Sequence, residues 1–270
     1  MMTSKGDEKM DIMLYAVPNI PLIKPGDDIG KIVCEKIKNE HFSIKDKDII
    51  VIASKIVSKA EGQIIDIQKI KASGEAVKLA EKIKVDPSYA QVLLNETKKF
   101  LWLKPEVVLT EHRLGIVCTK AGIDRSNVSP GKGRIVSLLP KNPDSSAKNI
   151  RRTIEMLTGK KIAVIINDTF GRPYRTGSVG MAIGISGISA LYSLEAKDLF
   201  DRKRHPMISQ VDEIAAAASI LMGQTTERRP IIIVRGFNYQ FSEKDTVVSD
   251  VIRPYEEEIL SIAEEIQRQK

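Results

Sequence analysis

The chain has 270 residues, which is enough for one large domain or for two intertwined lobes. Its 42 Lys and Arg outnumber 35 Asp and Glu, and this net charge of +7 favours anionic ligands. Basic and acidic residues are interleaved and no nucleic-acid-binding motif is evident, so we expect no nucleic acid partner.

Three further classes are disfavoured by the composition. No apolar run reaches the roughly 18–20 residues that span a membrane, and we expect no membrane partner. The first residues lack the basic-then-apolar order of a signal peptide, so we expect a cytoplasmic protein. Cys34 and Cys118 are too few for a disulfide framework, and we expect two ordinary half-buried thiols.

The first half of the chain alternates apolar runs with amphipathic stretches. Residues 13–23 predict a strand and a loop, because prolines interrupt them, and residues 26–40 have the apolar spacing of a helix. Residues 48–62 begin as a buried β-branched strand and continue as a polar loop with Lys55, Ser58, Lys59 and Glu61. Residues 73–103 predict two helices divided near Pro87, and residues 107–124 predict two short strands joined by a turn.

The second half begins with a loop, residues 126–134. Residues 145–160 predict an amphipathic helix with a serine cap and Gly159 after its end. The sequence then predicts a strand at 161–168, an alanine-rich helix at 209–224, a strand at 228–236 and a charged helix at 250–270. We predict a mixed α/β (α+β) fold with one domain over residues 14–250, a seam between two lobes near 129–150, an N-terminal tail at 1–13 and a C-terminal helix at 251–270.

Candidate ligand-binding residues follow the predicted strand at 161–168. Asp168 and Thr169 stand at its carboxyl end, where α/β sheets bind ligands, and a carboxylate is a hard oxygen donor for Mg²⁺ or Mn²⁺. Arg172 and Arg175 can bind phosphate or carboxylate groups. Three glycines permit close backbone approach to a ligand: Gly171, Gly177 and Gly180. The alternative is that Asp168 caps a turn and the arginines are solvated.

Three weaker signals lie elsewhere in the chain. Asp124 and Asn127 follow a predicted strand, and the alternative for them is an Asx-turn. Lys55 and Lys59 would share a face on a helical turn and could meet phosphates, or form a solvated basic surface. Gln224 follows the helix-ending Gly223 and presents an amide to a ligand, or simply belongs to a C-cap.

Several other motifs are absent from the sequence. There is no GxxxxGK[ST], no GxGxxG after a strand and no GxSxG, so a P-loop, a Rossmann site and a Ser-His-Asp hydrolase are all disfavoured. The three histidines are scattered without metal-ligand spacing, which makes a histidine zinc site improbable.

Taken together and in order, the segments IPLIKPGDD, SKIVSKAEG, KAGIDRSNV, INDTFGRPYRTGSVGMAIGISG, VDEIAAAASILMGQ and IIIVRG form one specific pattern. This pattern resembles the coenzyme F420-0:L-glutamate ligase family, the F420 gamma-glutamyl ligases, over about residues 14–240. The resemblance implies an unusual mixed α/β fold, F420 gamma-glutamyl ligase-like, and a homodimer.

The resemblance also implies a reaction. GTP activates the terminal carboxylate of F420-0, a deazaflavin with a phospholactate arm, as an acyl phosphate. The amino group of L-glutamate then attacks it, and later glutamates join through gamma linkages. Mn²⁺ or Mg²⁺ is required and K⁺ assists.

Matched motif by motif, the resemblance assigns candidate site residues. The metal ligands implied are Asp124, Asp168, Thr169 and Gln224. The nucleotide-contacting residues implied are Ile20, Pro21, Leu22, Ile23, Ser54, Lys55, Lys59, Asn127, Met222, Gly223, Gln224, Thr225, Thr226, Glu227, Arg228 and Arg229. We assign no nucleophile or general base, and we take Arg172 and Arg175 as candidates for positioning the acceptor or the glutamate.

One segment departs from the family pattern. In DLFDRKRHPMISQVDEIA, Asp201 stands where a glycine is expected, and His205 and Pro206 interrupt an expected apolar strand. This departure bears on specificity for the acceptor or for glutamate. The main alternative is therefore a sibling GTP- and metal-dependent amide ligase with another carboxylated acceptor. A non-enzymatic anion-binding module is the second alternative.

Overall fold

The computed structural model describes residues 11–38, 40, 42–105, 107–128, 134–172, 175–242 and 248–253. The strands are β1 (Met13–Ala16), β2 (Ile49–Ala53), β3 (Ile64–Asp66), β4 (Thr97–Lys104), β5 (Val107–His112), β6 (Val117–Thr119), β7 (Ile135–Ser137), β8 (Ala163–Arg172), β9 (Arg175–Ile188), β10 (Tyr192–Ser193), β11 (Ala196–Lys197), β12 (Lys203–Arg204), β13 (Met207–Ile208), β14 (Ile231–Arg235) and β15 (Phe241–Ser242). The α-helices are α1 (Ile29–Lys38), α2 (Ser54–Ala60), α3 (Gly74–Ile83), α4 (Pro87–Glu96), α5 (Pro143–Thr158) and α6 (Gln210–Met222). Three 3₁₀ turns are η1 (Ile67–Lys69), η2 (Lys120–Gly122) and η3 (Val248–Val251).

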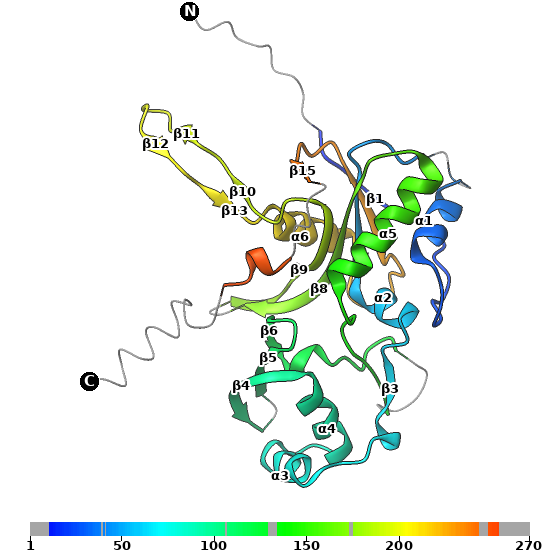
Figure 1. Ribbon diagram of the computed structural model, residues 1–270, viewed down its shortest axis with the longest axis vertical. Helices are drawn as coiled ribbons and strands as arrows, with labels where there is room; N and C mark the ends of the chain where they lie inside the picture. Colours follow the sequence, from blue (N-terminus) through cyan, green and yellow to red (C-terminus); the bar gives the residue numbers. More distant parts are fainter. Residues whose placement is uncertain are drawn as a thin grey trace, which may run out of the picture.

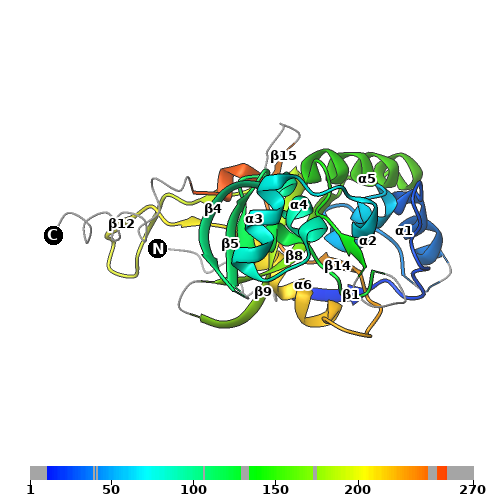
Figure 2. The ribbon, with the colours of Figure 1, turned by 90° about the horizontal axis from the view of Figure 1, so that it is seen from below.

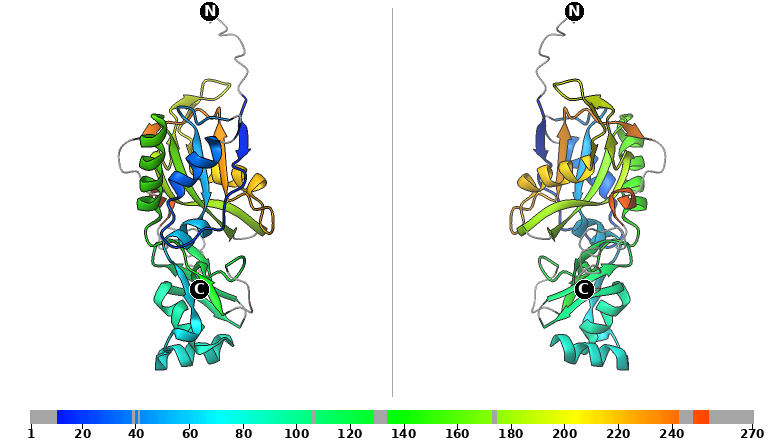
Figure 3. Two further views of the ribbon diagram at one scale, coloured as in Figure 1. Left: turned by 90° about the vertical axis from the view of Figure 1, so that its right-hand side faces the viewer. Right: turned by 90° about the vertical axis from the view of Figure 1, so that its left-hand side faces the viewer.

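A six-stranded sheet in the order β1-β14-β2-β8-β9-β15 forms the centre of the larger lobe. Its β-branched strands are buried on both faces, because side chains alternate across a strand and helices cover both sides. Ile50 and Ile52 of β2 face α1 and α5, whereas Ile49 and Val51 face α6. The result is a three-layer arrangement with α6 on one side of the sheet and α1 and α5 on the other (Figure 1; Figure 3). Together with the smaller lobe it makes the mixed α/β fold that the sequence predicts.

The smaller lobe is inserted between α2 and α5. The chain leaves the large lobe after α2 through β3 and returns through β7, which pairs antiparallel with β3. Between these strands, α3 and α4 pack on the three-stranded sheet β4-β5-β6 around a separate apolar core (Figure 2). A long hairpin, residues 192–208, projects from the large lobe and is built from the pairs β10–β13 and β11–β12 (Figure 1).

Strand β9 is longer than anything the sequence predicts for residues 175–188, since glycine weakens strands and masks their pattern. The glycines make room for helices. A Cβ on Gly180 would lie 1.9 Å from Ser219 Oγ of α6, and a Cβ on Gly184 would lie 2.4 Å from the Pro143 carbonyl carbon at the start of α5. Gly180 therefore allows close helix packing, which is a different role from the close ligand approach that the sequence predicted.

Three local predictions need correction. Residues 54–60 form helix α2 and not a loop, and residues 97–104 form strand β4 and not the end of a helix. The start of α5 is capped by Asn142, whose side chain accepts from the Ser145 amide, and not by a serine. Both cysteines are buried, with exposures of 5% and 4%, and not half-buried.

Parts of four predicted segments lie outside the described residues. These are residues 1–10 of the predicted tail, residue 39 of the helix predicted at 26–40, residues 129–133 of the predicted loop and residues 254–270 of the predicted C-terminal helix. Across the part of the chain that the structure describes, no helix is long and apolar enough to cross a membrane.

Candidate active site

The candidate site begins where β2 ends and its pairing with β8 stops. Strand β8 itself continues to Arg172, so Asp168 lies inside this strand and not at the carboxyl end that the sequence predicted. The two are neighbouring parallel strands, with Ala53 in register with Asn167, so the next residues, Ser54 and Asp168, emerge side by side. Carboxyl ends of adjacent parallel strands are where α/β sheets place ligands. Ser54 begins α2, and its side chain is near enough to Asp168 to act against the rise in the pKa of that carboxyl.

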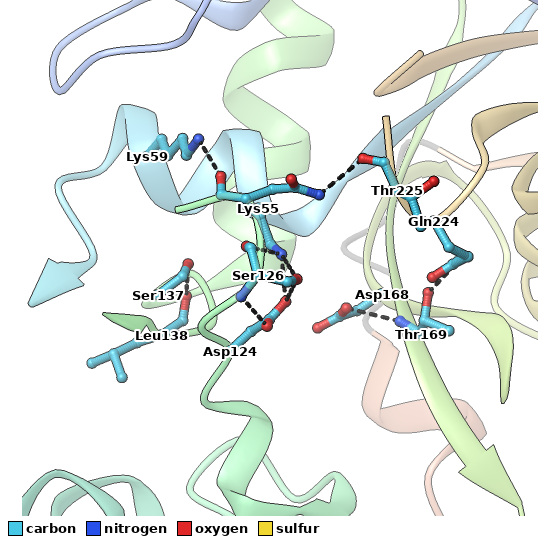
Figure 4. Close-up of polar contacts among 11 residues, drawn as sticks. Lys55, Lys59, Asp124, Ser126, Ser137, Leu138, Asp168, Thr169, Gln224 and Thr225 are labelled. Atoms are coloured by element: carbon cyan, nitrogen blue, oxygen red, sulfur yellow. Dashed lines mark hydrogen bonds and ion pairs between the residues drawn. The ribbon is translucent and has the colours of Figure 1, made fainter. Parts of the chain in front are cut away.

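Helix α2 places two lysines toward the small lobe. Lys55 Nζ donates to Asp124 Oδ2, to the Ser126 carbonyl at 2.7 Å and to Ser126 Oγ at 2.8 Å, which uses all three ammonium hydrogens (Figure 4). One turn further on, Lys59 Nζ donates to the Asn127 carbonyl at 2.8 Å. Burial, and then the neighbouring Lys55 ammonium, lower the pKa of Lys59. The two lysines share one face of α2, as the sequence predicted for the case in which they lie on a helical turn.

Asp124 lies in a tight turn of the small lobe. Its Oδ1 accepts from the Ser126 amide at 2.7 Å, and its Oδ2 accepts from Ser126 Oγ at 2.9 Å as well as from Lys55. Burial would raise the pKa of Asp124, but the hydrogen bonds from Lys55 and Ser126 outweigh it and hold that pKa below its ordinary value. Asp124 is therefore an ionised carboxylate that joins the small lobe to α2 of the large lobe.

Asp168 is the carboxylate with the opposite shift. Burial and, to a lesser degree, the negative charge of Asp124 raise the pKa of Asp168 to about 6. The hydrogen bond from the Thr169 amide, the Lys55 charge and Ser54 act in the opposite direction but are weaker. Its Oδ1 accepts from the Thr169 amide at 2.8 Å. Figure 4 shows the Asp168 carboxyl group pointing toward Asp124, so two carboxylates from different lobes converge there.

The loop after α6 closes the other side of the site. Gln224 Nε2 donates to Thr169 Oγ1 at 3.3 Å, and Asn127 Nδ2 donates to the Thr225 carbonyl at 3.0 Å (Figure 4). Glu227 accepts from the Thr225 amide at 2.7 Å, which folds the loop back on itself. Segments 124–127 and 168–169 therefore meet the loop at 222–229, and segment 54–59 joins them through the hydrogen bonds of Lys55 and Lys59.

The remaining predicted residues lie around this cluster. Residues 20–23 lead into a turn beside α2, because the Gly26 amide donates to the Ala60 carbonyl; within them Leu22 is 82% exposed and Ile23 is buried. Arg172 and Arg175 are paired across the end of the β8–β9 hairpin. Arg172 is four residues beyond Asp168, which is about 13 Å along a strand, so neither arginine belongs to the cluster.

Two polar residues of this region were not predicted. Ser126 accepts two hydrogen bonds from Lys55, and the signal for it was its place in an Asp-x-Ser turn. Glu61, at the end of α2, accepts from the Lys141 amide at 3.1 Å and from Ser146 Oγ. Glu61 thereby binds both the connector that returns the chain from β7 to α5 and the first turn of α5.

Cys118 of β6 is close enough to Asp168 for the two groups to interact. Burial, and then the Asp168 charge, raise the pKa of its thiol to about 12. The thiolate is the nucleophilic form, so Cys118 stays protonated and unreactive.

The cluster contains groups that can bind anions and groups that can bind cations. Two ammonium groups face two carboxylates, an amide and a hydroxyl. Within the described residues, no group of three or more His, Cys, Asp or Glu gathers as a ready metal site. The set here instead offers two carboxylates with Gln224 and Thr169, which are hard oxygen donors suited to Mg²⁺ or Mn²⁺.

Comparisons with known proteins agree with this architecture. The family model of F420-0:Gamma-glutamyl ligase matches residues 18–236. A coenzyme F420:L-glutamate ligase of Methanothermobacter thermautotrophicus is 41% identical over 92% of this chain and 98% of that protein. Proteins of the same name from Methanocaldococcus jannaschii and Archaeoglobus fulgidus are 43% and 37% identical, over 89% and 93% of this chain and 93% and 97% of their own.

The chain therefore belongs to the F420-0:gamma-glutamyl ligase family. The family that the sequence motifs indicated is confirmed.

Within the family, the atypical hairpin has a local explanation. Asp201 adopts φ = 62°, a left-handed conformation that glycine takes at no steric cost. Here Asp201 Oδ1 accepts from Lys197 Nζ at 3.0 Å, and Asp198 Oδ1 accepts from the Phe200 and Arg202 amides. Asp201 therefore lies in the turn between β11 and β12, in the projecting hairpin (Figure 1).

Proposed function

We propose that this protein is a GTP-dependent ligase that joins L-glutamate to coenzyme F420-0. The observation that carries the proposal is the convergence of Asp124, Asp168, Lys55 and Lys59 beside the carboxyl end of β2, in a chain of this family. Such a cluster matches the need to hold several anionic reactants at once.

The proposed reaction has two steps. The terminal carboxylate of F420-0 attacks the γ-phosphorus of GTP, which forms an acyl phosphate and releases GDP. The amino group of L-glutamate then attacks the acyl carbon, loses a proton and expels phosphate, which leaves an amide. Repetition with the γ-carboxylate of the added glutamate as the acceptor extends the chain.

Lys55 and Lys59 are proposed to neutralise the triphosphate. Both ammonium groups point from one face of α2, and both already bind oxygen atoms there. Phosphate oxygens can replace those acceptors, and burial of Lys59 strengthens its interaction with an anion. Positioning and electrostatics dominate phosphoryl transfer, so no protein nucleophile is needed.

Divalent-cation binding is proposed for Asp124, Asp168, Thr169 and Gln224. The donor set fits Mn²⁺ or Mg²⁺, because Asp168 is a carboxylate whose charge is poorly compensated in the protein alone. Bound there, a divalent ion would offset charge on the transferred phosphoryl group. K⁺ is proposed to assist, and replacement of potassium by sodium salts tests this.

Two segments are proposed to contact the nucleotide around this centre. Residues 20–23 adjoin α2, and the loop from Met222 to Arg229 contacts Asn127 through Thr225. Arg172 and Arg175 are proposed to hold the acceptor phosphate or the glutamate carboxylates from the far end of the hairpin.

A homodimer is also proposed. The projecting hairpin carries large exposed apolar side chains, with Leu199 98%, Phe200 79% and Met207 69% exposed, which is unfavourable in a monomer. Light scattering during gel filtration would measure the mass, and Phe200→Asp should lower it if this hairpin contacts a second copy. A monomeric mass for the unaltered protein would refute the dimer.

The ligase activity is tested with purified protein, F420-0, L-glutamate, GTP and Mn²⁺, followed by mass spectrometry. A mass gain of one or more glutamyl residues with GDP release is the expected result. GTP turnover only with another carboxylated acceptor would identify the sibling ligase. Absence of GTP turnover by folded protein with every acceptor would refute the enzymatic proposal and favour an anion-binding module.

A further inference from the structure

One buried polar side chain of the large lobe has no part in the proposed reaction. Asn167 of β8 is 3% exposed and directly precedes Asp168. Successive side chains of a strand alternate between its faces, so Asn167 shares the face of Ile165, which packs in the core beneath α6. A polar group in such an apolar layer costs free energy unless it is hydrogen-bonded, so the partners of Asn167 indicate its role.

The amide nitrogen of Asn167 binds the last turn of α6. Its Nδ2 donates to Ser219 Oγ at 3.1 Å and to Met222 Sδ at 3.6 Å. Ser219 uses its own hydroxyl hydrogen on the Ala215 carbonyl, 2.9 Å away, so the Ser219 oxygen is left to accept. This requirement fixes the orientation of the Asn167 amide, with both of its hydrogens directed at the helix.

The amide oxygen of Asn167 is buried at a cost. Asn167 Oδ1 has no hydrogen-bond partner in the described ranges of the chain, and it faces Gly180 of β9, where a Cβ would lie 2.6 Å from it. A buried acceptor without a donor is unfavourable, and an apolar side chain of similar size would avoid this cost. What an apolar side chain would not supply is the pair of bonds to α6.

The last turn of α6 leads directly into the loop that closes the candidate site. Met222 ends the helix, and two residues later Gln224 donates to Thr169 Oγ1 at 3.3 Å (Figure 4). Thr169 is two residues beyond Asn167, so both side chains lie on the same face of β8. Strand β8 therefore holds the end of α6 and the start of the loop at two adjacent points, and Asp168 stands between these points on the opposite face.

We propose that Asn167 is the positioning residue for this loop. By fixing the last turn of α6, Asn167 keeps Gln224 beside Thr169 and Asp168, where the divalent cation is proposed to bind. It acts through the loop and not by contact with the cation or the nucleotide. The inference rests on the proposed function and adds to it a residue outside the proposed ligand set.

A test without ligands measures the attachment of the loop. Arg228 and Arg229 are exposed in the loop, and trypsin can cleave after Arg228 but not at the bond between Arg229 and Pro230. Mass spectrometry of a limited digest gives the rate of cleavage after Arg228, relative to cleavage after the exposed Arg202 of the projecting hairpin. We expect Asn167→Ala to raise this ratio about fivefold, the change in local opening that corresponds to the loss of one hydrogen bond.

Gln210→Ala is the matched control. Gln210 is 2% exposed, and its Nε2 donates to the Ser189 carbonyl at 2.7 Å at the opposite end of α6. This variant removes a buried amide from the same helix but leaves the last turn intact. We expect both variants to lose stability and only Asn167→Ala to raise the cleavage ratio. An equal ratio in the two variants, or an unchanged ratio in Asn167→Ala, would overturn the proposal.

Ser219→Ala keeps the test informative if Asn167→Ala does not fold. It removes the acceptor of the same hydrogen bond and introduces a better helix former, so the helix itself is not weakened. The cleavage ratio should rise as in Asn167→Ala. The double variant should add little, because both changes break one bond; fully additive effects would show that Asn167 does not act through Ser219 and would overturn the proposal.

Metal binding distinguishes this inference from the proposed function. The electron paramagnetic resonance signal of free Mn²⁺, recorded with GTP present, gives the Mn²⁺ affinity of each variant. Asn167→Ala and Ser219→Ala should weaken Mn²⁺ binding about tenfold, as loss of a group that orients a metal ligand does, and Gln210→Ala should bind like the wild type. Faster cleavage with unchanged Mn²⁺ affinity would overturn the proposal. Absence of Mn²⁺ binding by the wild type would refute the metal site of the proposed function, and the cleavage ratios, which need no ligand, would still show whether Asn167 holds the loop.

Discussion

Replacement of Asp168 by Asn should stabilise the protein without ligands. Burial, with the added repulsion of Asp124, raises the pKa of Asp168 from 3.8 to about 6, so the ionised carboxylate is disfavoured in the folded state. A shift of about two units corresponds to about 3 kcal/mol, and this is the upper limit of the gain. The asparagine carbonyl can still accept the hydrogen bond from the Thr169 amide.

The sign of the pH dependence follows from this shift. The folded protein holds the Asp168 proton to higher pH than the unfolded chain, so wild-type stability falls as pH rises from about 4 to about 6 and stays lower above that. Asparagine does not titrate, so the stability of the variant does not fall for this reason as pH rises. The difference in unfolding free energy should therefore be small near pH 4 and reach its full value by pH 7–8.

The assay is thermal unfolding by circular dichroism at several pH values. For proteins near this size, 3 kcal/mol corresponds to a midpoint increase of roughly 6–12 °C. Asp86→Asn is the matched control, because Asp86 caps α4 by accepting from the Ser88 and Tyr89 amides, and asparagine caps about as well. A lower midpoint for Asp168→Asn at pH 8, or a difference independent of pH, would refute the reasoning.

The same variant should lose activity. Mn²⁺ with GTP should raise the unfolding midpoint of the wild type, because a ligand stabilises the folded state that binds it. Without the Asp168 carboxylate, the variant should not show this increase. The combination of higher stability and lost ligand response would mark Asp168 as a functional carboxylate held at a cost to folding. An equal ligand-induced midpoint shift in both proteins would exclude Asp168 from the metal site.

Three further outcomes are expected. Lys59→Ala should weaken GTP affinity about tenfold or more, measured by calorimetry, because a charge-assisted hydrogen bond is lost; unchanged affinity would remove Lys59 from the nucleotide site. Gly180→Ala should cost about 1–3 kcal/mol in chemical denaturation, since its Cβ would overlap a serine hydroxyl of α6, whereas Gly171→Ala, with open space around it, is the control. Arg235→Met should cost about 3–5 kcal/mol, because it leaves the fully buried Asp48 carboxylate without its ion-pair partner; a loss below 1 kcal/mol would show that Asp48 is satisfied otherwise.

Local patterns predicted the buried framework of the large lobe well. The β-branched runs of β2 and β8 and the amphipathic pattern of α5 are strong signals, since burial on both faces or on one stripe requires them. Strand β9 was missed because its glycines serve the approach of α5 and α6, a requirement that appears only in three dimensions. Helix α2 was predicted as a loop because its polar residues, which face the candidate site, hide the apolar pattern of a helix.

Only part of the candidate site can be predicted from local sequence patterns, and the reason is physical. Ser54 and Asp168 are the next residues after the last partners of the parallel β2–β8 pair, so their proximity follows from sheet geometry alone. Asp124 was a candidate because it follows a predicted strand, but it belongs to the other lobe and no local pattern places it beside Lys55; the family resemblance supplied its predicted role as a metal ligand. Lys55 contacts Ser126 through a turn whose orientation depends on how the lobes pack, and single-sequence patterns carry no such information.

The ion pair of Lys55 and Asp124 links two separately packed cores, together with the hydrogen bonds from Lys59 to Asn127 and from Asn127 to Thr225. Any bound anion competes with Asp124 for the same ammonium group. If the proposed triphosphate binds Lys55, occupancy of the site would loosen this contact, and the angle between the lobes would change with what is bound.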